Sequence, residues 1–199
     1  MIAYGAVVDT NDASGATVFR LPRSHWHCAL WNFDWETVHP ASLHDRVLAF
    51  LHGVQDKKAP HLILTGPPGI GKTHVGIGAY RVGSVTWGTE LVTWLNMPAF
   101  CERVKRAYGD ASADPWYDLE SAKRLVVVDD MFGKALSPHE TDQILVRLLD
   151  TCYQNGAAML ITMNPSVEEI QKRLNPHEIS RMLADSTIIP MQADTDRRR

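Results

Sequence analysis

The chain has 199 residues, which suits one α/β domain or slightly more, and its composition is that of a globular protein, with 45% hydrophobic and 22% charged residues. The formal net charge of −3 excludes a polycation, so any contact with nucleic acid has to come from a local basic patch or from an assembled oligomer. Three scattered cysteines without a C-x-x-C pair predict reduced thiols and a cytoplasmic location. Neither a signal peptide nor an apolar run long enough to cross a membrane is found, so no membrane partner is expected.

Residues 1–40 are expected to form an N-terminal arm that ends in an aromatic lead-in. Residues 24–35 (SHWHCALWNFDW) contain three tryptophans and one phenylalanine, which are costly to leave in water, so we expect this segment to pack on the main domain. His25, His27 and Cys28 raise the alternative of a metal site. Their spacing fits no common zinc pattern and the sequence shows no second ligand cluster, so an aromatic packing segment is the preferred interpretation.

The most specific motif of the chain follows a helix and a strand. An amphipathic helix is expected over residues 40–53, and the apolar run 61–64 is typical of a buried strand. Residues 66–73 (GPPGIGKT) then match the phosphate-binding pattern G-x-x-x-x-G-K-[ST] at every fixed position, and residues 73–81 are expected to be helical. A glycine- and proline-rich turn before an ordinary helix is the alternative, but the complete match between a strand and a helix favours a phosphate loop.

The residue types of this loop fit nucleotide binding. Its three glycines permit backbone conformations that a side chain would block, and their N–H groups, with the N-terminus of the following helix, surround the β-phosphate of a nucleotide. Lys72 is expected to reach the β- and γ-phosphates and Thr73 to ligate Mg²⁺, so ATP and Mg²⁺ are the expected cofactors. The expected nucleotide-binding residues are Gly66, Pro67, Pro68, Gly69, Ile70, Gly71, Lys72, Thr73 and His74.

The region after the loop contains a basic helix. Residues 83–88 are expected to form turns, residues 91–95 a second strand, residues 97–108 a helix and residues 114–122 a further short helix. Three basic side chains lie on one face of the longer helix: Arg103, Lys105 and Arg106. A solvated surface is the default interpretation of these charges, and contact with nucleic-acid phosphates is the alternative.

Two acidic residues end the next apolar run. Residues 125–128 predict a central strand, and Asp129 and Asp130 follow it at the carboxyl end, where α/β sheets bind ligands. Asp129 is expected to hold Mg²⁺ directly or through water, and Asp130 to polarise the attacking water as general base. A strand that ends in a solvated acidic turn is the alternative, which the upstream phosphate loop disfavours.

The remaining elements complete an alternating pattern. Helices are expected over residues 137–155, 166–174 and 176–184, and strands over residues 157–162 and 186–191. Five strands that alternate with helices predict an α/β fold with a five-stranded parallel sheet and helices on both faces.

Two further residues narrow the class of protein. Asn164 stands at the exit of the strand after the acidic one, where an amide can orient the attacking water. Arg181 stands before the last strand, where an arginine can point into the nucleotide site of a neighbouring subunit. Taken singly, Asn164 also fits turn chemistry with Pro165, and Arg181 also fits an ordinary surface charge. Their order along the chain, after the phosphate loop and the acidic strand, is much more specific.

This order of motifs resembles that of AAA+ ATPases of the helicase-loader type (DnaC and DnaI) and of the transposition helper IstB. The resemblance runs from about residue 34 to residue 191. The matching segments are an aromatic lead-in at 31–34, a Walker A loop at 66–74, a Walker B end at 129–133, a sensor 1 segment at 161–165 and an arginine-finger segment at 180–183. The second Walker B acid of this clade is often Glu, so Asp130 is a shorter base.

The resemblance implies a P-loop AAA+ core over residues 41–191. A basic tail is expected over residues 192–199, and no C-terminal lid domain is expected after the last strand, a departure that this clade tolerates. It implies a homo-oligomer that assembles around ATP and in which Arg181 completes the site of the next subunit. In this clade the helix after the second strand, here about 97–108, is implicated in contact with single-stranded DNA. Helicase loaders also carry an N-terminal domain that grips the helicase, for which the residues before the phosphate loop are too few.

The function that the resemblance implies is that of an Mg²⁺-dependent ATPase in DNA replication, a loader of the replicative helicase. The alternative is a transposition helper that delivers target DNA to a transposase. A small-molecule P-loop kinase is disfavoured, because the sequence has no arginine-rich lid and such an enzyme gives Asn164 and Arg181 no role. A nucleotide-binding scaffold with little turnover is disfavoured by Asp129 and Asp130.

Overall fold

A five-stranded parallel sheet forms the centre of the computed structural model, which describes residues 21, 23–56, 61–108, 114–133, 137–172, 174, 176–183 and 186–193. The strands are β2 (His61–Thr65), β3 (Val92–Asn96), β4 (Leu125–Asp129), β5 (Ala158–Met163) and β6 (Ser186–Pro190). Their order in the sheet is β3-β4-β5-β2-β6, and every neighbouring pair is parallel. The predicted five-stranded parallel sheet is therefore confirmed.

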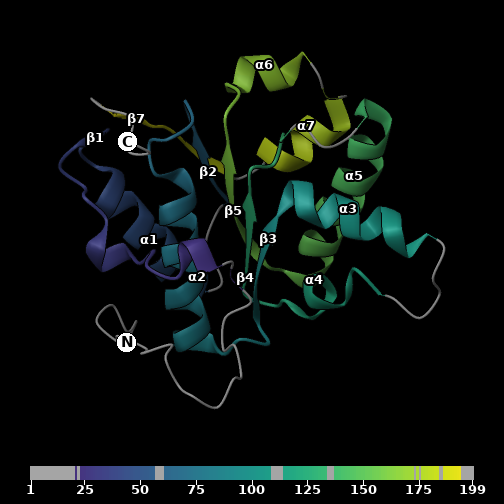
Figure 1. The fold of residues 1–199 in the computed structure, drawn as a ribbon, viewed down its shortest axis with the longest axis horizontal. Coiled ribbons are helices and arrows are strands. Elements are labelled where there is room, and N and C mark those ends of the chain that lie inside the picture. Colours follow the sequence, from purple (N-terminus) through teal and green to yellow (C-terminus); the bar gives the residue numbers. More distant parts are fainter. Residues whose placement is uncertain are drawn as a thin grey trace.

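Helices cover both faces of this sheet (Figure 1). The first face carries α1 (Leu43–Gln55) and α2 (Lys72–Trp87). The second face carries α3 (Met97–Ala107), α4 (Tyr117–Ser121), α5 (Pro138–Asn155) and α7 (Pro176–Leu183), while α6 (Val167–Gln171) follows β5 at the carboxyl edge of the sheet. Among the described helices, none combines the length and the apolar character that crossing a membrane requires.

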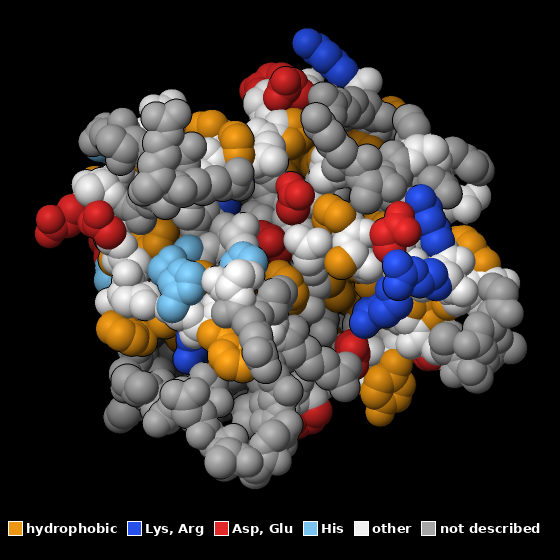
Figure 2. Space-filling view, viewed as in Figure 1, with side chains coloured by type: hydrophobic (Ala, Val, Ile, Leu, Met, Phe, Trp, Pro, Cys, Tyr) orange, Lys and Arg blue, Asp and Glu red, His pale blue; other side chains and the backbone are white. Residues whose placement is uncertain are grey.

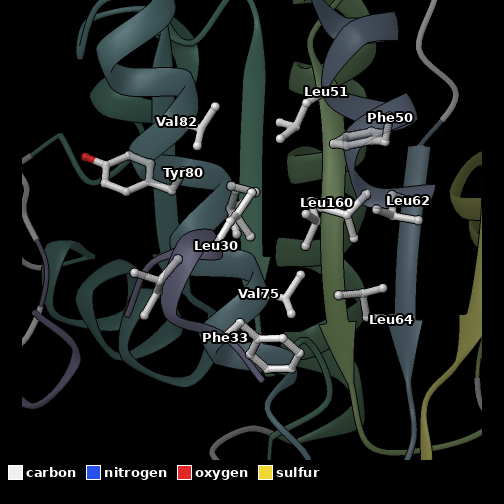
Figure 3. Packing of buried hydrophobic residues seen from close by; sticks show 14 of the residues in the cluster. Leu30, Phe33, Phe50, Leu51, Leu62, Leu64, Val75, Tyr80, Val82 and Leu160 are labelled. Atoms are coloured by element: carbon white, nitrogen blue, oxygen red, sulfur yellow. The ribbon is translucent and has the colours of Figure 1, made fainter. Parts of the chain in front are cut away.

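The central strands are mostly apolar because both of their faces are buried. Successive side chains of a strand point to opposite faces, so Leu62 and Leu64 of β2 join the core under α1 and α2, and Ile63 joins the core under the other helices. Figure 3 shows Leu62 and Leu64 beside Leu160 of β5, facing Val75 of α2. This packing fixes the start of α2, and with it the loop that precedes the helix, against the sheet.

Helix α2 is longer than the sequence predicts. A helix ending at residue 81 and turns over 83–88 were expected, but α2 continues to Trp87. Gly83 serves packing instead of a turn, because a Cβ atom there would lie only 3.0 Å from the Trp87 ring and 3.3 Å from Leu125. The helix ends at Gly88, whose φ of +97° favours glycine.

The aromatic lead-in packs on α2 through only part of its side chains. Phe33 is buried, and Leu30 lies so close to α2 that a Cβ on Gly78 would be 2.8 Å from the Leu30 backbone nitrogen. Trp31 is 65% exposed and Trp26 is 37% exposed. The expectation that this segment packs on the main domain is therefore right for Phe33 and wrong for Trp31.

A second, two-stranded sheet joins the two ends of the described chain. β1 (Val38–His39) pairs antiparallel with β7 (Gln192–Ala193), so these four residues lie side by side although they were assigned to the arm and the tail. The part of the predicted arm before residue 21 and the tail from residue 194 lie outside the described residues.

Candidate nucleotide-binding site

The phosphate loop connects β2 to α2 at the carboxyl edge of the sheet. Three of its glycines have positive φ angles: +140° at Gly66, +86° at Gly69 and +98° at Gly71. A Cβ on Gly71 would lie 2.5 Å from the ring of Phe33, so this glycine is also required by the lead-in that packs over it. Successive N–H groups in such a loop, followed directly by a helix N-terminus, form a concave site for an anion.

Lys72 begins α2 and its ammonium group is held against the backbone of the loop. Its Nζ donates to the carbonyl oxygens of Gly66 and Pro67, each at 2.7 Å, and the residue is only 6% exposed. The side chain thus places a positive charge next to the loop where phosphate oxygens bind.

Asp129 ends β4 and faces the first turn of α2. Its Oδ1 accepts a hydrogen bond from Thr73 Oγ1 at 2.8 Å, and the residue is 4% exposed. The two residues that the sequence assigns to Mg²⁺ therefore lie in direct contact, although 56 positions separate them in the chain. A carboxylate oxygen beside a hydroxyl oxygen is the kind of donor set that Mg²⁺ accepts, so these residues fit the ion.

Thr162 of β5 belongs to this cluster, and the sequence analysis missed it. Its Oγ1 donates to Asp129 Oδ1 at 2.7 Å and accepts the backbone N–H of Asp130 at 3.0 Å. One hydroxyl therefore positions both acidic residues. The signal available in the sequence was a polar residue inside an apolar strand. In the fold, β5 pairs with β4 over four residue pairs, and this pairing brings Thr162 to the end of the acidic strand.

Asp130 and Asn164 lie together beyond the ends of β4 and β5. Asp130 adopts φ +54°, a left-handed conformation that is uncommon outside glycine but tolerated by Asp. Asn164 Nδ2 lies 3.4 Å from Asp130 Oδ1. Because β5 is placed between β4 and β2 in the sheet, Asn164 leaves the sheet between Asp130 and the phosphate loop.

Two further residues of the predicted site are Arg181 and His74. Arg181 lies in α7, and its side chain is outside the described residues. His74 follows Thr73 in α2, but its ring contacts the lead-in: Nε2 is 3.0 Å from the Ala29 carbonyl oxygen and 2.9 Å from Asn32 Oδ1.

Replacing Thr162 with valine is expected to raise the Mg²⁺ concentration needed for half-maximal ATP hydrolysis by about 10–100-fold, the usual effect of losing a group that orients a metal ligand. Valine keeps the size of the side chain but removes both of its hydrogen bonds. The matched control is Thr93→Val in strand β3, which also replaces a buried threonine of the sheet. An unchanged Mg²⁺ requirement would show that Asp129 is positioned without this hydroxyl.

Comparison with known proteins identifies the family. Residues 10–199 match the family described as IstB-like ATP binding protein. The chain belongs to this family. No curated protein matches the chain. The expected resemblance to the AAA+ helicase-loader and IstB clade is confirmed, and ATP binding is a property of the family.

Solved structures with the same fold include a helicase loader, a putative primosome component and a replication initiator. The DnaC helicase loader matches with a TM-score of 0.72 at 17% identity, over 86% of this chain and 100% of that chain. A putative primosome component from Streptococcus pyogenes matches with 0.68 at 21% identity, over 88% and 91% of the two chains. The replication initiator DnaA bound to AMPPCP and single-stranded DNA matches with 0.69 at 16% identity, over 90% of this chain and 53% of that one. The likeness confirms the predicted P-loop AAA+ core.

Proposed function

We propose that this IstB-like protein is an Mg²⁺-dependent ATPase that assembles around ATP and loads a replicative helicase onto DNA. The observation that carries the proposal is the cluster of Thr73, Asp129, Thr162, Asp130 and Asn164, which gathers groups suited to hold Mg²⁺ and to activate water at one edge of the sheet. A mere nucleotide-binding scaffold has no need for the last two.

The chemistry follows from the roles proposed for these side chains. Lys72 neutralises charge on the β- and γ-phosphates, and Thr73 with Asp129 holds Mg²⁺. Asp130 takes a proton from the attacking water while Asn164 orients that water. Arg181 of an adjacent subunit stabilises the charge that develops on the γ-phosphate, so turnover requires assembly.

Contact with single-stranded DNA through α3 is part of the proposal, and α3 offers less positive charge than its sequence alone indicates. Arg103 Nη1 lies 3.8 Å from Asp118 Oδ2, and Lys105 Nζ lies 3.5 Å from Glu102 Oε1, so both basic groups are paired with carboxylates. Figure 2 shows lysine or arginine side chains gathered with acidic ones over the part of the surface where α3 lies. We therefore place DNA contact in the assembled oligomer, where several copies of α3 contribute together.

A second candidate function is that of a transposition helper, which delivers target DNA to a transposase. It is favoured by the family match itself, because the described family is IstB-like and the match covers residues 10–199. Both functions use the same ATPase cycle and differ in the partner protein.

The test is a pull-down from host lysate with the Asp130→Asn variant in the presence of Mg²⁺ and ATP. Asparagine removes the base and is expected to hold the ATP-bound assembly, so its partner is retained. Lys72→Ala is the control, because a chain that does not bind ATP is expected to retain no partner. Recovery of the replicative helicase supports the loader, and recovery of a transposase moves the assignment to the transposition helper. If neither is recovered and the unchanged chain, as a monomer, transfers the γ-phosphoryl group of ATP to a small-molecule acceptor with release of ADP, the proposal is wrong.

A further inference from the structure

Three metal-ligating side chains lie together on the side of α2 that the lead-in covers. They are His27 and Cys28 of the lead-in and His74 of α2, and one ligand atom from each lies within 4.8 Å of the other two. Cys28 is buried, His74 is half-buried and His27 is exposed. Figure 2 shows histidine side chains gathered over this part of the surface.

The spacing is close to that of ligands on one metal ion. With Zn–S bonds of about 2.3 Å and Zn–N bonds of about 2.0–2.1 Å at tetrahedral angles, a sulfur and a nitrogen ligand are about 3.5 Å apart. The distance between Cys28 Sγ and His27 Nε2 is 3.7 Å. The two atoms therefore need almost no movement to bind the same ion.

Residues of the lead-in contact the His74 ring in the way that neighbouring groups contact metal-binding histidines in other proteins. His74 Nε2 lies 3.0 Å from the Ala29 carbonyl oxygen, 2.9 Å from Asn32 Oδ1 and 3.1 Å from the Ala29 backbone nitrogen. Asn32 Nδ2 donates to the His27 carbonyl oxygen at 2.7 Å. These contacts with the lead-in fix the orientation of the His74 ring. Metal-binding histidines are commonly fixed in this way by a carbonyl or amide oxygen.

The backbone that carries the other two ligands is also fixed to α2. Arg81 donates to the carbonyl oxygens of Trp26 at 2.8 Å and Cys28 at 3.1 Å. Burial raises the pKa of Cys28 to about 11, with Arg81 opposing the shift. Cys28 is therefore a thiol at neutral pH, and on metal binding its S–H bond is replaced by a sulfur–metal bond while the proton passes to the solvent.

We propose that His27, Cys28 and His74 form a site for zinc that clamps the lead-in onto the first turn of α2. A thiolate and two imidazoles select zinc over Mg²⁺, which prefers oxygen ligands. The fourth position is taken by water, since His27 lies at the surface. The sequence analysis preferred a packing segment because it found no second ligand cluster. The third ligand stands 46 positions beyond Cys28, so only the fold brings it near.

The test is a titration of the metal-free full chain with Co²⁺, without nucleotide or Mg²⁺. One equivalent is expected to produce a thiolate-to-cobalt charge-transfer band together with the visible bands of tetrahedral Co²⁺, and Zn²⁺ is expected to abolish both. Cys28→Ala is expected to lose the charge-transfer band. His27→Ala, which changes an exposed residue and keeps the fold, is expected to weaken Co²⁺ binding by at least about tenfold.

Matched controls are Cys152→Ala and His25→Ala, which remove another buried cysteine and a neighbouring histidine and are expected to bind as the unchanged chain does. The proposal is overturned if the unchanged chain gives no charge-transfer band. It is also overturned if Cys28→Ala or His27→Ala binds Co²⁺ as the controls do, which would mean that the three side chains are a hydrogen-bonded packing cluster.

Discussion

Replacing Lys72 with alanine is expected to weaken ATP binding by about 30- to 4,000-fold. Removing one partner of a buried, hydrogen-bonded charge pair costs about 2–5 kcal/mol, and each 1.4 kcal/mol is about a factor of ten in affinity. Lys72 is 6% exposed and is already held at the loop by two carbonyl oxygens, so little ordering of its side chain opposes binding. Equilibrium titration with a fluorescent ATP analogue measures the effect.

The control for this variant is Lys172→Ala, which removes an exposed lysine at the end of α6 and leaves the loop intact. Thermal unfolding without nucleotide separates a loss of affinity from a loss of fold, because Lys72 also bonds the carbonyls of Gly66 and Pro67. A folded Lys72→Ala protein with unchanged affinity for ATP would remove the phosphate-loop assignment.

The sequence predicts the phosphate loop and the acidic strand well because each depends on neighbouring residues. The glycines of residues 66–71 permit positive φ angles, and all three of them, Gly66, Gly69 and Gly71, adopt such angles in the structure. The apolar run 125–128 has no alternation, which is typical of a strand buried on both faces, and β4 is buried at every position. Local patterns of this kind are compatible with few other backbone conformations.

The features that the sequence does not predict depend on contacts between distant parts of the chain. Gly83 favours a turn by its type, yet in the fold it allows Trp87 and Leu125 to approach α2. Thr162 resembles any strand threonine until β5 pairs with β4 and brings its hydroxyl to Asp129. His74 completes a motif in sequence, but its ring bonds Ala29 across 45 positions.

Replacing Arg181 with alanine is expected to preserve ATP affinity and to lower assembly-dependent hydrolysis by about 10³–10⁵-fold, the effect of an arginine that acts across subunits. Arg181 lies in α7, which is fixed on the sheet because Met182 is buried in the core and Ile179 and Leu183 pack against it. The measurement is the ATPase rate per chain as protein concentration rises, with Arg147→Ala, an exposed arginine paired with Glu120, as control.

Mixing two inactive variants distinguishes an arginine that acts across subunits from one that acts within its own chain. Arg181→Ala keeps an intact nucleotide site, whereas Lys72→Ala keeps its arginine but is expected to bind ATP only weakly. If Arg181 completes the neighbouring site, the mixture hydrolyses ATP although neither variant does so alone, because the Lys72→Ala chain supplies the arginine. If Arg181 serves the site of its own chain, no mixture regains activity, since every chain that binds ATP lacks the arginine it needs.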